Sequence, residues 1–96
     1  IQEQAIPHLL NGLDLLGLAP TGTGKTAAFA LPILNKLLSS KSRGLSTLIL
    51  TPTRELADQV RMTFEALSQG TPIRTTAVFG GVSFNNQLLE LRRGVE

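Results

Sequence analysis

The chain has 96 residues, of which 42% are hydrophobic and 17% are charged, and its formal net charge is +2. These values are typical of one small globular domain and exclude a disordered chain. No apolar run is long enough to span a bilayer, so no membrane partner is expected. The absence of cysteine excludes disulfides and thiolate metal sites and is compatible with the cytoplasmic location that we expect. The small positive charge permits a nucleic-acid partner without arguing strongly for one.

The first predicted elements are a short helix over residues 2–10 and a strand over residues 14–18. Pro7 is expected to interrupt the helix. The strand is almost wholly apolar, which is typical of a strand buried on both faces of a parallel sheet. His8 has no second histidine, cysteine or carboxylate at ligand spacing, so we expect no metal site there.

A glycine-rich segment, Ala19-Pro20-Thr21-Gly22-Thr23-Gly24-Lys25-Thr26, follows this strand directly. Its layout of strand, glycine turn and helix start is that of a phosphate-binding loop. The glycines allow consecutive backbone N–H groups to turn inward around an anion. Lys25 would add a positive charge for the β- and γ-phosphates, and the Thr26 hydroxyl is placed to bind Mg²⁺. The alternative is a glycine turn that caps an ordinary helix and leaves Lys25 solvated.

The next predicted helix, over residues 25–38, is apolar on almost all sides, as is typical of a buried helix. Pro32 lies inside it and is expected to kink it, because proline removes one backbone hydrogen bond. A polar loop over residues 39–44 then leads to a second buried strand, residues 47–50.

A third helix, predicted over residues 54–69, carries one apolar stripe, which indicates that a single face is buried. On its outer face we expect Arg54 to pair with Asp58, and Arg61 with Glu65, because residues four apart are neighbours on a helix.

A third strand over residues 73–79 is followed by Gly80-Gly81 and by a last helix that Ser83 can cap. Residues 92–96 have the character of an approach to another strand. The resulting order is one helix followed by three strand–helix units. Alternation of this kind predicts an α/β doubly wound domain, with a parallel sheet and helices on both of its faces.

Two of these segments follow strand ends, where ligands bind in open α/β sheets. Residues 51–57 could hold a phosphate through the free N–H groups of the helix start and through Arg54. Simple helix capping with a surface salt bridge is the alternative, and the residues alone favour it. Gly80-Gly81 permits close approach of a ligand or merely forms a turn, and Gln2 either reads a purine edge or is solvated.

Taken together, four segments resemble the DEAD-box family of ATP-dependent RNA helicases. In chain order they are Ile1-Gln2, Ala19 to Thr26, Pro52-Thr53-Arg54-Glu55-Leu56-Ala57 and Gly80-Gly81. The third is the specific one, because generic phosphate-loop proteins lack it. The resemblance runs along the whole chain. It implies that residues 1–96 are a part of the first RecA-like helicase domain, a P-loop NTPase domain, truncated at both ends.

The resemblance also implies the cofactors, ATP and Mg²⁺, and the residues that hold them. Gln2 would be the adenine-reading glutamine of the family's Q motif. The nucleotide would be bound by Gln2, Ala19, Pro20, Thr21, Gly22, Thr23, Gly24, Lys25 and Thr26. Of these, Lys25 and Thr26 would be catalytic, and Thr26 would ligate the metal. The RNA backbone would be bound, without regard to sequence, by Pro52, Thr53, Arg54, Glu55, Gly80 and Gly81.

The activity implied for the full-length protein is RNA-stimulated ATP hydrolysis that drives local unwinding of RNA duplexes. The motif that orients the metal and the attacking water, and the second RecA-like domain, would lie in the rest of the helicase core. The chain alone is therefore expected to bind nucleotide weakly, not to hydrolyse it, and to be able to associate with itself through uncovered edges. Two alternatives stay open: another superfamily-2 helicase that acts on DNA, and a non-catalytic nucleotide- or RNA-binding module.

Overall fold

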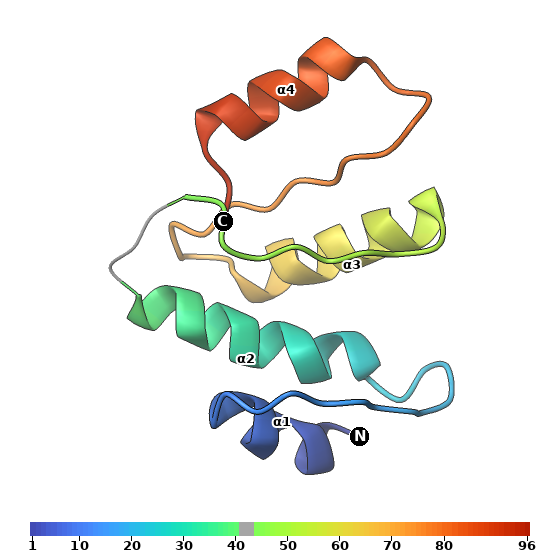
Figure 1. The fold of residues 1–96 in the computed structure, drawn as a ribbon, viewed down its shortest axis with the longest axis vertical. Coiled ribbons are helices and arrows are strands. Elements are labelled where there is room, and N and C mark those ends of the chain that lie inside the picture. The colour runs from blue at the N-terminus through green and yellow to red at the C-terminus, as the bar shows by residue number, and fades with distance from the viewer. Residues whose placement is uncertain (41–43) are drawn as a thin grey trace.

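The computed structural model describes residues 1–40 and 44–96 and has four helices there. They are α1 (Gln2–Leu10), α2 (Lys25–Ser39), α3 (Arg54–Leu67) and α4 (Phe84–Arg93) (Figure 1). All of the helices expected from the sequence are confirmed, although α3 ends before the predicted residue 69. Part of the loop predicted over residues 39–44 lies outside the described residues.

The starts of the helices differ in how their free N–H groups are capped. The Thr53 hydroxyl accepts a hydrogen bond from the Leu56 N–H at 3.1 Å and caps α3. The Ser83 hydroxyl caps α4 by accepting from the Asn86 N–H at 3.4 Å. Helix α2 follows Gly24, which has no side chain to cap it. No capping side chain binds the free N–H groups in the first turn of α2, so these groups are left to bind another partner.

The prolines do not divide the helices that contain them. Helix α1 continues through Pro7, so the predicted interruption is wrong, because the helix survives the loss of a single backbone bond. Helix α2 likewise continues through Pro32, which is buried.

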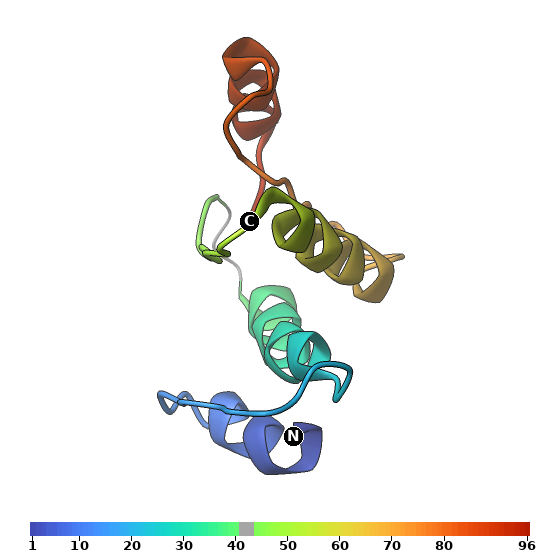
Figure 2. The same cartoon turned by 90° about the vertical axis from the view of Figure 1, so that its right-hand side faces the viewer.

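The core lies between α2 and α3, and α2 is sandwiched between α1 and α3 (Figures 1 and 2). Four buried side chains form its centre: Ala30, Leu34, Val60 and Phe64. The Phe29 ring packs on that of Phe64 with the ring centroids 6.2 Å apart and the planes tilted by 40°. Each large apolar side chain buried in this way contributes about 1.5–3 kcal/mol. Hydrophobic packing between two helices thus stabilises the element that carries the glycine-rich loop.

Burial of α2 is less complete than its composition predicts. Leu31 and Leu38 are 40% and 54% exposed, so the prediction that this helix is buried all round is wrong. The reason is that, among the described elements, only α1 and α3 pack closely on it.

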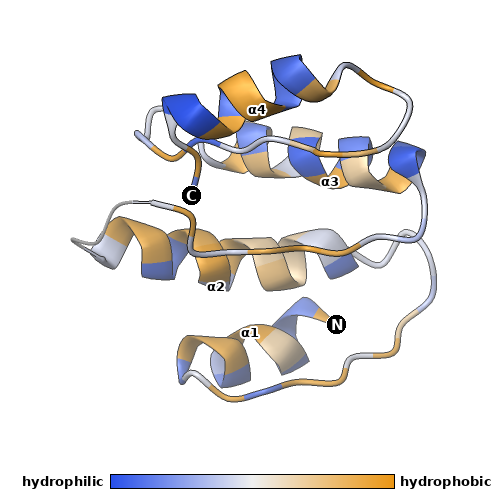
Figure 3. Ribbon diagram, turned by 45° about the horizontal axis from the view of Figure 1, so that its top comes forward, coloured by the Kyte–Doolittle hydropathy of each residue, from blue (hydrophilic) through white to orange (hydrophobic). Residues whose placement is uncertain are grey.

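The predicted sheet is not formed by the residues that the structure describes. The three segments predicted as strands are extended but form no strand ladder. Much of their ribbon is coloured hydrophobic orange in Figure 3, and in the first two segments large apolar side chains are uncovered, with Leu16 89%, Leu18 88% and Leu50 85% exposed. The prediction of strands buried on both faces is therefore not met, because these segments do not lie against one another as neighbouring strands.

Glu96 joins two of these extended segments. Its carbonyl accepts hydrogen bonds from the N–H groups of Ser46 and Thr47, both at 2.9 Å, and its N–H donates to the Arg74 carbonyl at 3.1 Å. Its carboxylate accepts a further bond from the Arg74 N–H at 2.8 Å. Glu96 therefore lies between the segments over residues 45–50 and 73–79 and bonds to both.

Candidate nucleotide and nucleic-acid sites

The glycine-rich loop forms the turn between the first extended segment and α2. Gly22 and Gly24 have φ angles of 80° and 81°, in the left-handed region that favours glycine. The Thr23 hydroxyl donates to the Pro20 carbonyl at 2.7 Å and closes the turn from within. The sequence places these glycines where the backbone needs them.

The positive groups of this loop come from Lys25 and from the start of α2. The Lys25 ammonium donates to the Ala19 carbonyl on the opposite side of the loop. It has three N–H donors, so this bond leaves two for another acceptor. The uncapped first turn of α2 adds backbone N–H groups and the positive end of the helix dipole. Donors of this kind, gathered at one turn, fit an anionic phosphate.

Gln2 lies beside the loop, although it is distant in the sequence. Its Nε2 donates to the Gly24 carbonyl at 3.4 Å. A Cβ atom at position 24 would collide with the same amide, so this contact also requires glycine there. The structure thus brings the predicted adenine-reading side chain to the phosphate-binding segment.

The Thr26 hydroxyl is the one side-chain group of the loop that is expected to bind Mg²⁺. Thr26 is partly buried at the start of α2. No group of three or more histidine, cysteine, aspartate or glutamate side chains gathers in a metal-binding arrangement within residues 1–40 and 44–96. Mg²⁺ is commonly held by one or two protein groups together with substrate phosphates. The residues present therefore fit a magnesium ion that arrives with a nucleotide and not one held by the chain alone.

A cavity of about 410 Å³ lies beside the start of α2. Its polar side chains are those of Lys25, Thr26 and Thr51, and the rest of its lining is apolar. A triphosphate needs many polar partners, so this apolar space does not fit one by itself. It separates the first extended segment from the second.

The residues expected to meet nucleic acid lie at the start of α3 and in the turn before α4. All six of them are exposed: Pro52, Thr53, Arg54, Glu55, Gly80 and Gly81. The two groups are linked directly, because Nη1 of Arg54 donates to the Gly80 carbonyl at 3.1 Å. The structure therefore brings together two segments that are far apart in the sequence.

The ion pairs on α3 differ in part from those expected. The pair of Arg61 with Glu65 is confirmed at 2.6 Å, but Asp58 pairs with Arg61 at 2.7 Å and not with Arg54. Hydrogen bonds to Asp58 and then to Glu65 raise the pKa of the Arg61 guanidinium above its ordinary value. Arg61 lies between two carboxylates on one helix face, whereas Arg54 turns to a backbone carbonyl.

Two polar side chains have positions that no sequence pattern signals. Oε1 of Gln87 on α4 accepts a hydrogen bond from the Phe79 N–H at 2.7 Å. The Thr51 hydroxyl donates to the Thr53 carbonyl at 3.1 Å. Both bonds steady the backbone beside the proposed nucleic-acid residues.

The family model for DEAD/DEAH box helicases matches residues 1–96. The chain belongs to this family. The resemblance read from the four segments is thus confirmed. None of the helices in the part described here is long and apolar enough to cross a membrane.

Curated relatives of this DEAD/DEAH box helicase chain are named as ATP-dependent RNA or rRNA helicases. It is 50% identical over 93 residues to the ATP-dependent rRNA helicase RRP3 of Meyerozyma guilliermondii, covering 97% of this chain and 19% of that protein. It is 45% identical over 94 residues to the ATP-dependent RNA helicase DBP3 of Lodderomyces elongisporus, covering 98% and 18%. The chain thus spans about a fifth of the length of these relatives.

A solved structure shows the same arrangement of the backbone. The RNA helicase Prp28 from Chaetomium thermophilum bound to ADP matches with a TM-score of 0.88 and 41% identity, covering 100% of this chain and 24% of that one. The fold of this DEAD/DEAH box helicase chain is therefore that of part of a RecA-like helicase domain.

Proposed function

We propose that residues 1–96 are the ATP-binding part of the first RecA-like domain of an ATP-dependent RNA helicase. The observation that carries this proposal is the loop over residues 19–26. Left-handed glycines, an uncapped helix start and the Lys25 ammonium come together there, and each suits a phosphate. The names of the relatives support the choice of ATP as the nucleotide and RNA as the substrate.

Each residue of the loop has a separate task in this proposal. The backbone of residues 19–24 and the first turn of α2 bind the phosphates, and Lys25 gives up its bond to the Ala19 carbonyl to bind them as well. Gln2 reads the adenine edge with its amide. The Thr26 hydroxyl holds Mg²⁺, which when bound neutralises charge on the phosphates.

The exposed edge formed by residues 52–55 and 80–81 is the proposed site for the RNA backbone. The N–H groups at the start of α3 suit phosphate oxygens, and Arg54 lies beside them in contact with Gly80. Phosphates are the same in every nucleotide, so binding here carries no sequence preference. A cytoplasmic location for the whole protein remains a prediction.

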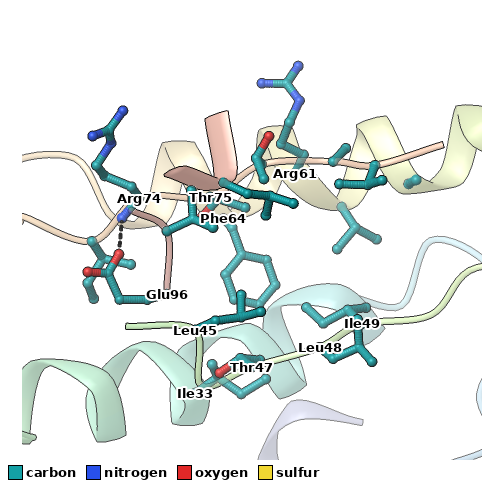
Figure 4. A pocket seen from close by; sticks show the side chains of 18 of the residues that line it. Ile33, Leu45, Thr47, Leu48, Ile49, Arg61, Phe64, Arg74, Thr75 and Glu96 are labelled. Carbon is teal, nitrogen blue, oxygen red and sulfur yellow. Dashed lines mark hydrogen bonds between the residues drawn. The ribbon is translucent and has the colours of Figure 1, made fainter. Parts of the chain in front are cut away.

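In the full-length protein, we propose that the extended segments become strands of a parallel sheet with helices on both faces. A cavity of about 410 Å³ separates residues 45–50 from residues 73–78, and Glu96 bonds to both sides of it. Figure 4 shows Phe64 reaching from α3 toward Ile33 and Leu45 at this cavity. Its lining is mainly apolar, which suits a buried strand from the rest of the helicase core.

ATP hydrolysis by the full-length protein, with and without RNA, tests the proposed function. We expect RNA to stimulate turnover and Lys25→Ala to reduce it about 100-fold, because a donor to the transferring phosphate is lost. Lys36→Ala is the matched control, since Lys36 is an exposed lysine at the other end of α2. Turnover that does not respond to RNA, or that is equal in the two variants, would contradict the proposal.

The 96-residue chain on its own is expected to show negligible turnover. Phosphoryl transfer needs a positioned water and a charge clamp besides the phosphate cradle. Clear hydrolysis by the purified chain would show that the cradle is sufficient. Weak ATP binding by the same sample, lost in Lys25→Ala, is the expected positive result.

A further inference from the structure

One hydrogen bond connects the start of α3 to the turn before α4. Nη1 of Arg54 donates to the carbonyl of Gly80 at 3.1 Å, across 26 positions of sequence. Among the described helices, α4 packs closely against no other. The position of the Gly80–Gly81 turn therefore depends on a few individual bonds, of which this is one.

The neighbouring glycine leaves room for the same guanidinium. A Cβ atom at Gly81 would lie 2.7 Å from Nη1 of Arg54, and the φ angle of Gly81 is 79°. Gly80 differs on both points, since an added Cβ would meet nothing within 4 Å and no left-handed φ is required. Arg54 thus contacts the turn at two consecutive residues, by a bond to one and by close approach to the other.

Arg54 has no acidic partner among the described ion pairs, which involve only Arg61 and Arg93. Its side chain is exposed, and a guanidinium has five N–H donors in a fixed planar fork. A side chain used only as a mobile charge would not need a defined carbonyl partner. The bond to Gly80 indicates that the task of Arg54 is geometric.

We propose that Arg54 is a positioning residue that holds the Gly80–Gly81 turn against the first turn of α3. The two segments then meet the RNA backbone as one preformed surface, and less ordering is needed when RNA binds. This inference rests on the proposed function, because it takes the edge over residues 52–55 and 80–81 to be the RNA site.

The salt dependence of RNA binding separates positioning from a direct phosphate contact. The full-length protein and its Arg54→Ala variant are titrated with single-stranded RNA at several salt concentrations. We expect the variant to bind roughly tenfold more weakly at each concentration, with an unchanged slope of log affinity against log salt. Loss of a phosphate contact would instead lower the slope by about 0.7, and that result would overturn the proposal.

A double-mutant cycle tests the contact between Arg54 and the turn. In the wild-type background, Gly81→Ala strains the backbone and also displaces the guanidinium. In the Arg54→Ala background only the strain remains, so Gly81→Ala should cost at least about threefold less RNA affinity there. Gly80→Ala is the matched control, and its effect should add to that of Arg54→Ala. Additive effects at Gly81, or equal coupling at both glycines, would overturn the proposal.

The same cycle is repeated on the midpoint of thermal unfolding, without RNA. Coupling between Arg54 and Gly81 in thermal unfolding would show that their contact is real. If the wild-type protein then bound no RNA, the assignment of this edge as an RNA site would be wrong. Wild-type RNA binding with no coupling in either measurement would overturn the positioning role and leave the proposed function standing.

Discussion

Gly22 and Gly24 share a left-handed backbone but have different surroundings. Nothing lies within 4 Å of a Cβ built on Gly22, whereas one built on Gly24 collides with the Gln2 amide. The left-handed backbone therefore favours glycine at both positions, and at position 24 an added Cβ would also displace the Gln2 amide. The two positions can be compared directly by the same substitution.

We expect Gly22→Ala to lower the free energy of unfolding by about 1–2 kcal/mol, the cost of a side chain in the left-handed region. Gly24→Ala should cost about 0.5–1.5 kcal/mol more, because it also displaces Gln2 from the Gly24 carbonyl. Denaturant titration of the full-length protein, with ATP affinity measured in parallel, checks both values. Equal losses at the two positions would mean that the contact with Gln2 contributes nothing.

At the scale of the element, helix starts are readable from sequence because their causes are local. Thr53 and Ser83 cap α3 and α4 through bonds to residues three positions ahead. The glycine loop was likewise predictable from its own residues. The partner of Arg54 was not, because Gly80 is distant in the sequence and a nearby Asp58 offered a plausible local pair. The predicted sheet is not confirmed among the described residues, since an apolar run does not tell which segment lies beside it.

The Thr53 cap of α3 should make a measurable contribution to the free energy of unfolding. Thr53→Ala removes the acceptor of the Leu56 N–H and should lower the free energy of unfolding by about 1 kcal/mol. Thr53→Ser keeps the hydroxyl and serves as the control, with a loss of only a few tenths of a kcal/mol. Denaturant titration of the two variants is the measurement. A serine variant as unstable as the alanine variant would rule out capping as the cause.

At the scale of the whole molecule, the first two extended segments expose apolar side chains and form no strand ladder within the described residues. Leu50 borders both cavities and is 85% exposed, which is the kind of edge that pairs with another chain. The purified 96-residue chain should therefore associate in a concentration-dependent manner, as light scattering can show.

Substitution at this edge tests where that association occurs. Leu50→Lys should raise the concentration for half-association about tenfold, because it removes apolar area and places a charge on the edge. Met62→Lys is the control, since Met62 is exposed on α3 and lines neither cavity. A monomer at every concentration, or equal effects of both substitutions, would contradict this view of the edge.

The bonds that Glu96 makes to Ser46 and Thr47 also set an order of events during synthesis. Ser46 and Glu96 are 50 positions apart, so the second extended segment is synthesised well before its partner. At about 5–20 residues per second, that interval lasts roughly 3 to 10 seconds. During it, the N–H groups of Ser46 and Thr47 lack the Glu96 carbonyl as their acceptor and can pair with another chain instead.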